Sequence, residues 1–162
     1  MIDLKTGEEI KEMQEGGQIL RKVVIELKKD IKVGISTQEI NNQAEKLIKK
    51  FGGQSSFNRV KGYRWSTCLP INEEIVHSPP SKRVLKDGDV LTVDIGVYFK
   101  GYHTDYSDTF VVGESKDEKI RKFLQVGKDT LYKAIKKLKK GNHLGEVSKV
   151  IKDEIKKTLT FS

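Results

Sequence analysis

The segment over residues 89–112 constrains the fold more than any other part of the chain. Alternation of period two is the pattern of a strand with one buried face, and here every second residue is apolar: Leu91, Val93, Ile95 and Val97. Asp94 lies on the opposite face of this strand. A turn is predicted near residues 99–101, after which the strand pattern resumes. We therefore expect a β-hairpin with one apolar face and one face that carries Asp94.

Helical patterns flank this hairpin on both sides. A Ser or Thr followed three residues later by Glu is the capping-box signature of a helix start, and it occurs at Thr6–Glu9, Ser36–Glu39 and Ser115–Glu118. Apolar residues spaced three and four apart then predict helices over residues 7–30 and 37–51. A second helix pair, interrupted by Gly141, follows Ser115. Strand-forming and turn residues predict a sheet over residues 55–112, so the fold class is α+β.

The two helix pairs are similar to each other in sequence. A Gly followed five residues later by Glu and an apolar residue occurs at Gly34-to-Glu39 and again, 107 residues on, at Gly141-to-Glu146. An internal repeat and a chance similarity between two glycine-linked helical hairpins both fit this match. If the repeat is real, the first copy runs helix, helix, sheet, whereas the second copy lacks its sheet.

Composition and charge bound the class of protein. A chain of 162 residues is about one domain. The lone Cys68 excludes an internal disulfide, residues 1–30 lack a secretory pattern, and no apolar run approaches the ~20 residues of a membrane span. A cytoplasmic location is expected. The net charge of +8 arises in residues 116–162, with 14 basic and 6 acidic residues, which could contact RNA or the ribosome or form a solvated face.

Asp94 and Asp105 form the most informative pair of polar residues. With a turn centred between Phe99 and Lys100, the two are predicted directly opposite each other on one face, with Cβ atoms ~4.5–5.5 Å apart. Carboxylates this close repel unless a proton or a cation lies between them. The pair predicts a site for Mn, Fe, Co, Zn or Mg, dinuclear if the carboxylates bridge two ions. Two solvated aspartates on an exposed sheet face also fit the spacing.

The three histidines carry different expectations. His77 precedes Ser78-Pro79-Pro80 and is predicted at the end of a short strand, as a ligand, a substrate-contacting acid or base, or a turn residue. His103 shares the face of Asp105 and His143 follows a helix break, and both are expected to be structural. The sequence lacks a G-x-S-x-G elbow and a glycine-rich phosphate loop, and one cysteine excludes zinc-finger spacing.

Residues 71–112 resemble type I methionine aminopeptidases of the pita-bread metallopeptidase class. The motifs that carry the resemblance are Ile-Asn-Glu-Glu-Ile-Val-His at 71–77, Leu-Lys-Asp-Gly-Asp at 85–89, Val-Asp-Ile-Gly-Val at 93–97 and Gly-Tyr-His-Thr-Asp at 101–105. The resemblance implies an α+β pita-bread (creatinase/aminopeptidase-like) fold. Residues 1–162 would then form one peptidase domain truncated at its C-terminus, holding the first helix-helix-sheet half and the helix pair of the second half.

The resemblance also implies the roles of individual residues. Asp94 would hold one metal ion and Asp105 would bridge two, the ions being Co, Mn, Fe or Zn. His77 would act in catalysis by hydrogen bonding to the scissile peptide of the substrate. The pocket for the methionine side chain would be lined by Cys68, Tyr63 and Phe57. The family's remaining ligands, one histidine and two glutamates, are not in this sequence, so the chain alone is expected to be weakly active or inactive.

The function that follows from the resemblance is metal-dependent removal of the initiator methionine from nascent proteins. The expected partners are peptides with an N-terminal methionine and the ribosome, with no role for a membrane or DNA. The alternative is a non-catalytic half-domain that binds the ribosome or nucleic acid through the basic C-terminal helices.

Overall fold

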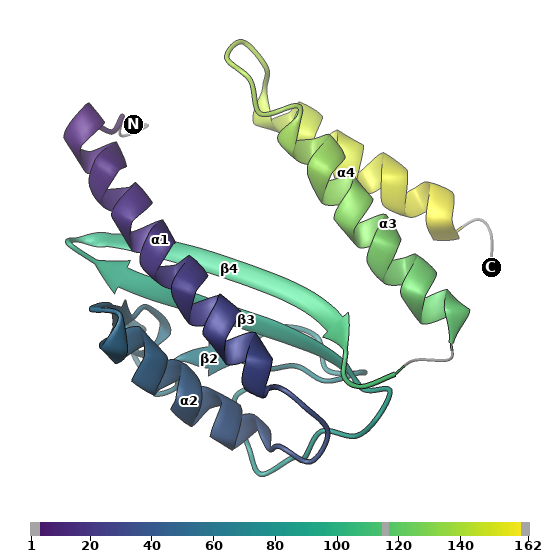
Figure 1. Cartoon of the computed structure of the whole chain (residues 1–162). Coiled ribbons are helices and arrows are strands. Elements are labelled where there is room, and N and C mark those ends of the chain that lie inside the picture. Colours follow the sequence, from purple (N-terminus) through teal and green to yellow (C-terminus); the bar gives the residue numbers. More distant parts are fainter. Residues whose placement is uncertain (1–3, 115–116, 160–162) are drawn as a thin grey trace. The chain divides into compact units, whose positions relative to one another are not determined.

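The computed structural model describes residues 4–114 and 117–159, which form two compact units divided after Glu114. Within these residues the first unit consists of two helices and a four-stranded sheet, and the second unit is a pair of helices (Figure 1). None of the helices in the described residues combines the length and the apolar character needed to cross a bilayer.

The first unit opens with two helices that start at the predicted capping boxes. The Thr6 hydroxyl accepts from the Glu9 amide, and the Glu9 carboxylate accepts from the Thr6 amide at 2.7 Å. Ser36 and Glu39 repeat the arrangement, so the first-turn amides of both helices are satisfied locally. The helices are α1 (Gly7–Asp30) and α2 (Thr37–Lys50), and both predicted spans are confirmed, the second to within one residue.

The sheet is built around β3 (Val90–Phe99), which pairs antiparallel with β4 (Tyr102–Val111) along one edge. The predicted hairpin is therefore confirmed. The other edge of β3 pairs with two strands of two residues each, β1 (Gln54–Ser55) and β2 (Thr67–Cys68).

Between β1 and β3 the chain is mostly loop, so the predicted sheet over residues 55–112 is too extensive. Prolines at 70, 79 and 80 cannot donate to a ladder and interrupt regular pairing. Residues 70–72 still run along β3, where the Thr92 amide donates to the Pro70 carbonyl at 3.0 Å and the Asn72 amide donates to the Val90 carbonyl at 2.9 Å. The loop is thereby anchored to the central strand.

The hairpin turn lies one residue later than predicted. Lys100 and Gly101 are its two central residues, with φ values of 46° and 93°. Positive φ at both positions is the mark of the tight two-residue turn whose twist matches that of paired strands. The centre of the turn is therefore between Lys100 and Gly101 rather than between Phe99 and Lys100.

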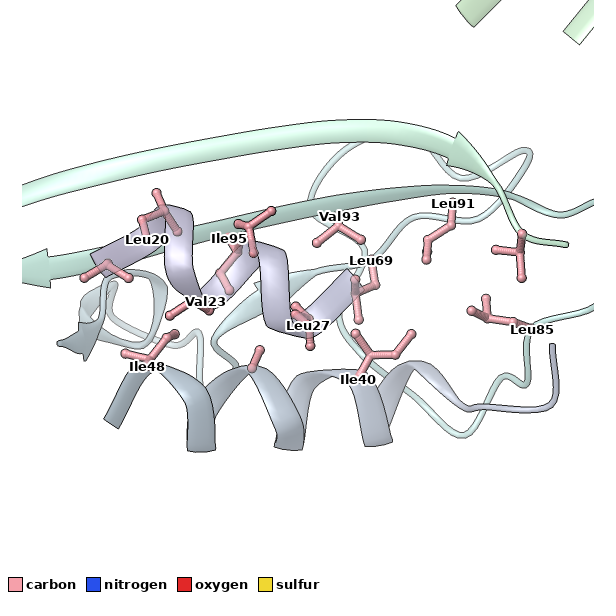
Figure 2. Packing of buried hydrophobic residues seen from close by; sticks show 14 of the residues in the cluster. Leu20, Val23, Leu27, Ile40, Ile48, Leu69, Leu85, Leu91, Val93 and Ile95 are labelled. Carbon is pink, nitrogen blue, oxygen red and sulfur yellow. The ribbon is translucent and has the colours of Figure 1, made fainter. Parts of the chain in front are cut away.

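The hydrophobic core lies between the two helices and one face of the sheet (Figures 1 and 2). Figure 2 shows side chains from α1, α2 and β3 meeting in a single layer, among them Leu20, Val23, Leu27, Ile40, Ile48, Val93 and Ile95. The odd-numbered residues of β3 supply this layer, as the alternation predicts. The even-numbered residues, Asp94 included, lie on the face that the helices leave uncovered.

The second unit consists of α3 (Glu118–Ile135) and α4 (Leu144–Leu159). Its first helix is capped by Asp117, whose carboxylate accepts from the Lys119 amide at 2.8 Å. Ser115 of the predicted capping box lies outside the described residues. The predicted interruption at Gly141 is confirmed, since this glycine has a φ of 94° in the connection. Lys133 donates to Glu154 at 2.6 Å and links the two helices.

Candidate functional site

The uncovered face of the hairpin brings Asp94 and Asp105 together, but in a different register from the one predicted. Asp94 is the partner of Ser107, and Asp105 is the partner of Gly96, so the two aspartates are diagonal neighbours and not directly opposite. The one-residue displacement of the turn causes this difference. Diagonal neighbours on one face still lie within reach of each other's side chains, and the charge of Asp105 acts on the carboxyl group of Asp94.

The surroundings of Asp94 disfavour its ionised form. Burial raises the pKa of Asp94 above its ordinary value, and the neighbouring charge of Asp105 raises it further, whereas His77 opposes the rise. Asp94 is half-buried, and Asp105 is exposed. The two carboxyl groups therefore repel each other on this face, and a cation between them would relieve that repulsion.

His77 lies in a loop and not at the end of a strand, contrary to the prediction. Its φ of 59° is a left-handed conformation that is uncommon for a residue with a side chain. Next to it, the Ser78 carbonyl accepts from the Leu69 amide at 3.0 Å and ties the loop to the segment after β2. His77 is exposed, and its electrostatic interaction with Asp94 lowers the pKa of that aspartate. The loop that carries His77 therefore lies within electrostatic reach of Asp94.

Cys68 and Tyr63 adjoin the pair on the other side of β3. Cys68 is the register partner of Asp94 across β2 and β3, and it is 4% exposed. The Tyr63 hydroxyl donates to the Thr67 carbonyl at 2.8 Å and lies 3.2 Å from the Cys68 Sγ atom. Burial raises the pKa of the Cys68 thiol and is also the main cause of a raised pKa at Tyr63. Both groups are therefore neutral at physiological pH.

Asn41 of α2 holds this side of the site and was not singled out from the sequence. Its Oδ1 atom accepts from the Ser66 amide at 2.9 Å and from the Thr67 hydroxyl at 3.1 Å, and its side chain is almost completely buried. These bonds position the segment that leads into β2. A polar residue next to the apolar stripe of a helix was the signal in the sequence.

Phe57 lies close to the aspartates because Gly96 leaves room for it. A Cβ atom at Gly96 would lie 2.9 Å from the Phe57 ring and 2.7 Å from the Ser56 Cβ atom. Since Gly96 is the register partner of Asp105, the ring packs beside the pair. His103 bonds to the Ser56 hydroxyl through Nδ1 at 2.6 Å, and its ring contacts that of Tyr98, in keeping with the structural role expected for it.

The two carboxyl groups suit a divalent cation as part of a ligand set, because hard oxygen donors sit side by side on a half-buried face. In residues 4–114 and 117–159 no cluster of three or more His, Cys, Asp or Glu side chains is placed to hold a metal ion. The fit is therefore to two ligands and not to a complete coordination sphere.

The hairpin presents its paired aspartates on the sheet face opposite the two capped helices, and the chain belongs to a class of hydrolases, metallopeptidase family M24, whose model matches residues 11–161. The α+β pita-bread fold expected from the sequence is confirmed. Within this family the chain is similar to methionine aminopeptidases. It is 44% identical to methionine aminopeptidase 1 of Bacillus subtilis over 93% of this chain and 60% of the relative.

Solved structures give the same assignment. The fold matches methionine aminopeptidase from Thermotoga maritima with a TM-score of 0.92 and 34% identity over 98% of this chain and 64% of that one. A second match is an Xaa-Pro dipeptidase from Bacillus anthracis, with a TM-score of 0.85 and 26% identity over 96% of this chain and 42% of that one. The chain spans about 60% of the length of the curated methionine aminopeptidases that it matches.

Proposed function

We propose that this chain carries the aspartate-bearing part of a metal-dependent methionine aminopeptidase, which hydrolyses the first peptide bond of nascent proteins and releases the initiator methionine. The observation that supports this most is the diagonal pair of Asp94 and Asp105 on one face of the hairpin, with Cys68 and Tyr63 beside Asp94. Similarity to methionine aminopeptidases over most of the chain supports the choice of substrate.

Each residue takes a defined role in this proposal. Asp94 and Asp105 would hold divalent ions of the Co, Mn, Fe or Zn type as carboxylate ligands. When bound, such ions polarise the scissile carbonyl and activate a nucleophile at neutral pH. His77 donates a hydrogen bond to the scissile peptide, and its exposed position leaves it accessible to substrate.

The remaining residues would select the methionine side chain. Cys68, Tyr63 and Phe57 offer a sulfur atom and two rings, which suit a flexible thioether. Tyr63 and Cys68 are neutral, so a charged side chain that entered the pocket would lose its hydration without gaining an ionic partner. The pocket therefore disfavours charged side chains.

The wider assignments are part of the same proposal. Both units belong to one peptidase domain over residues 1–162, a view supported by the family match across both of them. Because the proposed substrates are nascent chains, the proposal assigns the protein to the cytoplasm, near the ribosome. Direct binding of the ribosome or nucleic acid by the basic helices α3 and α4 is not proposed, since the relatives give no support for it.

Methionine release tests the proposal. The purified chain is incubated with a Met-Ala-Ser peptide and Mn²⁺ or Co²⁺, and binding of the peptide is measured in parallel by calorimetry. Mn²⁺ should bind weakly, and Asp94→Ala should abolish both metal binding and any turnover, because one of two anionic ligands is lost. A chain that binds neither Mn²⁺ nor the peptide, while folded by circular dichroism, would exclude this function.

A further inference from the structure

Three cations border the candidate site without a carboxylate partner. Arg59, Lys61 and Arg64 lie in residues 57–65, the basic loop, and all three are exposed. The sequence holds no acidic residue between positions 55 and 72. In the part of the chain that the structure describes, none of the three forms an ion pair. Other cations of the same unit do contact a carboxylate, among them Lys28, Arg83 and Lys100.

Aromatic rings hold two of these cations in place. The Arg59 guanidinium lies 3.8 Å from the centre of the Tyr98 ring, and Tyr98 shares the uncovered face of β3 with Asp94. The Arg64 guanidinium lies 4.7 Å from the centre of the Trp65 ring, which packs 5.2 Å from Tyr63. Arg59 also donates to the Gln54 side-chain oxygen at 3.2 Å. Stacking on a ring leaves the other N–H groups of a guanidinium available to an anion, and a guanidinium held in this way loses little conformational freedom on binding.

The distance between Asp94 and Tyr98 along β3 determines how long a ligand must be to contact both the aspartates and the basic loop. Tyr98 is four residues from Asp94, which is about 13 Å along a strand. An extended peptide whose first residue lies at Asp94 and Asp105 reaches Arg59 with its fourth or fifth residue at the same rise per residue. We propose that the basic loop is a subsite for acidic side chains at these positions of the substrate. This inference rests on the proposed aminopeptidase function.

A peptide suits the basic loop better than a nucleic acid does. Proteins that bind nucleic acids commonly neutralise ~6–10 phosphates, and the loop offers three cations in nine residues. Two of the three are stacked on rings that belong to the surroundings of Tyr63 and Asp94, so an anion bound there lies beside the proposed methionine pocket. The position of the basic loop beside the proposed methionine pocket therefore favours an acidic peptide substrate as its ligand.

Calorimetry with matched pentapeptides tests the subsite. The probes are Met-Ala-Ser-Glu-Glu-amide and its neutral isostere Met-Ala-Ser-Gln-Gln-amide, titrated into the whole chain in 50 mM salt with Mn²⁺. The acidic peptide should bind about three- to tenfold more tightly, since exposed charge pairs each contribute little. The difference should vanish in 1 M salt, where the screening length falls to ~3 Å.

Substitutions in the basic loop test whether it causes the difference in affinity between the two peptides. The combined substitutions Arg59→Gln, Lys61→Gln and Arg64→Gln should give the two peptides equal affinities. Arg59→Gln alone, which leaves Arg64 stacked on Trp65, should reduce the difference in affinity. Arg21→Gln, on the exposed surface of α1, is the matched control and should preserve it. Equal binding of both peptides by the unmodified chain would overturn the subsite alone, whereas no binding of either would overturn the aminopeptidase function as well. Tighter binding of a uridine decamer, lost in the triple variant, would replace the peptide by RNA.

Discussion

The carboxyl group of Asp94 lowers the stability of the folded chain at neutral pH. Its carboxyl is half-buried beside Asp105, and burial together with that neighbour raises its pKa. A carboxyl whose pKa is higher in the folded than in the unfolded chain lowers stability above the folded pKa, and this loss disappears below the unfolded value of about 4. A divalent cation at the pair would offset the same repulsion, so the cost is understandable at a metal site.

Asp94→Asn should therefore raise the melting temperature at pH 7 and leave it nearly unchanged at pH 3. The new amide carries no charge, so it removes both the repulsion from Asp105 and the cost of burying a second carboxylate. Thermal unfolding across pH 3 to 8, in the presence of a chelator, measures the effect. The expectation fails if the variant is less stable at pH 7 or if its advantage is independent of pH.

Gly96 determines how closely the Phe57 segment approaches the aspartates. Gly96→Ala should destabilise the chain by about 1–3 kcal/mol, because its methyl group would overlap Ser56 and the Phe57 ring. Urea unfolding measures this loss. Gly17→Ala is the matched control, since a methyl group at that position of α1 meets nothing within 4 Å and should instead stabilise the helix by about 0.5–1 kcal/mol. Equal effects of the two substitutions would contradict the close packing at Gly96.

At the scale of elements, the hairpin turn decides which residues meet. The positive φ of Gly101 sets the turn, and with it the diagonal placement of Asp94 and Asp105. Gly101→Ala should cost about 1–2 kcal/mol through backbone strain alone, since its new methyl group would have open space. Chemical-shift mapping of β3 and β4 should reveal the altered turn. A stability within 0.3 kcal/mol of the unmodified chain would argue against the observed turn.

The same turn marks the limit of what the sequence predicts. Helix limits follow from capping boxes and periodicity, which are local, and α1 was located to the residue. The face of β3 that carries Asp94 also follows from alternation. The turn is one residue from the predicted position because several neighbouring positions could supply it, and the positive φ values at Lys100 and Gly101 distinguish them.

The site residues are brought together by long-range contacts that local sequence patterns do not predict. Cys68 meets Asp94 because Asn41 anchors the segment before β2, and this bond joins residues 25 and more apart in sequence. The position of His77 depends on a loop whose backbone bonds go to the segment after β2 and not to a regular strand. The resemblance to a family identified Cys68 and His77 as site residues, whereas periodicity alone identified only the aspartate pair.

At the scale of the whole molecule, the two units differ in how much apolar surface they bury. The first unit has a continuous core of side chains from both helices and the sheet. In the second unit, Thr130 and Ala134 are the buried residues among those described, and Phe123, Leu131 and Leu144 are exposed. Stability scales with buried apolar area, so the second unit should be the less stable of the two.

The units should therefore unfold in separate steps. Trp65, the one tryptophan of the sequence, reports only on the first unit, whereas circular dichroism at 222 nm sums the helices of both. In urea the dichroism should begin to fall before the Trp65 emission changes, because α3 and α4 melt first. Hydrogen exchange should agree, with amides of α3 and α4 exchanging faster than those of α1 and β3. Coincident transitions would mean that the units unfold as one and that their stabilities are coupled.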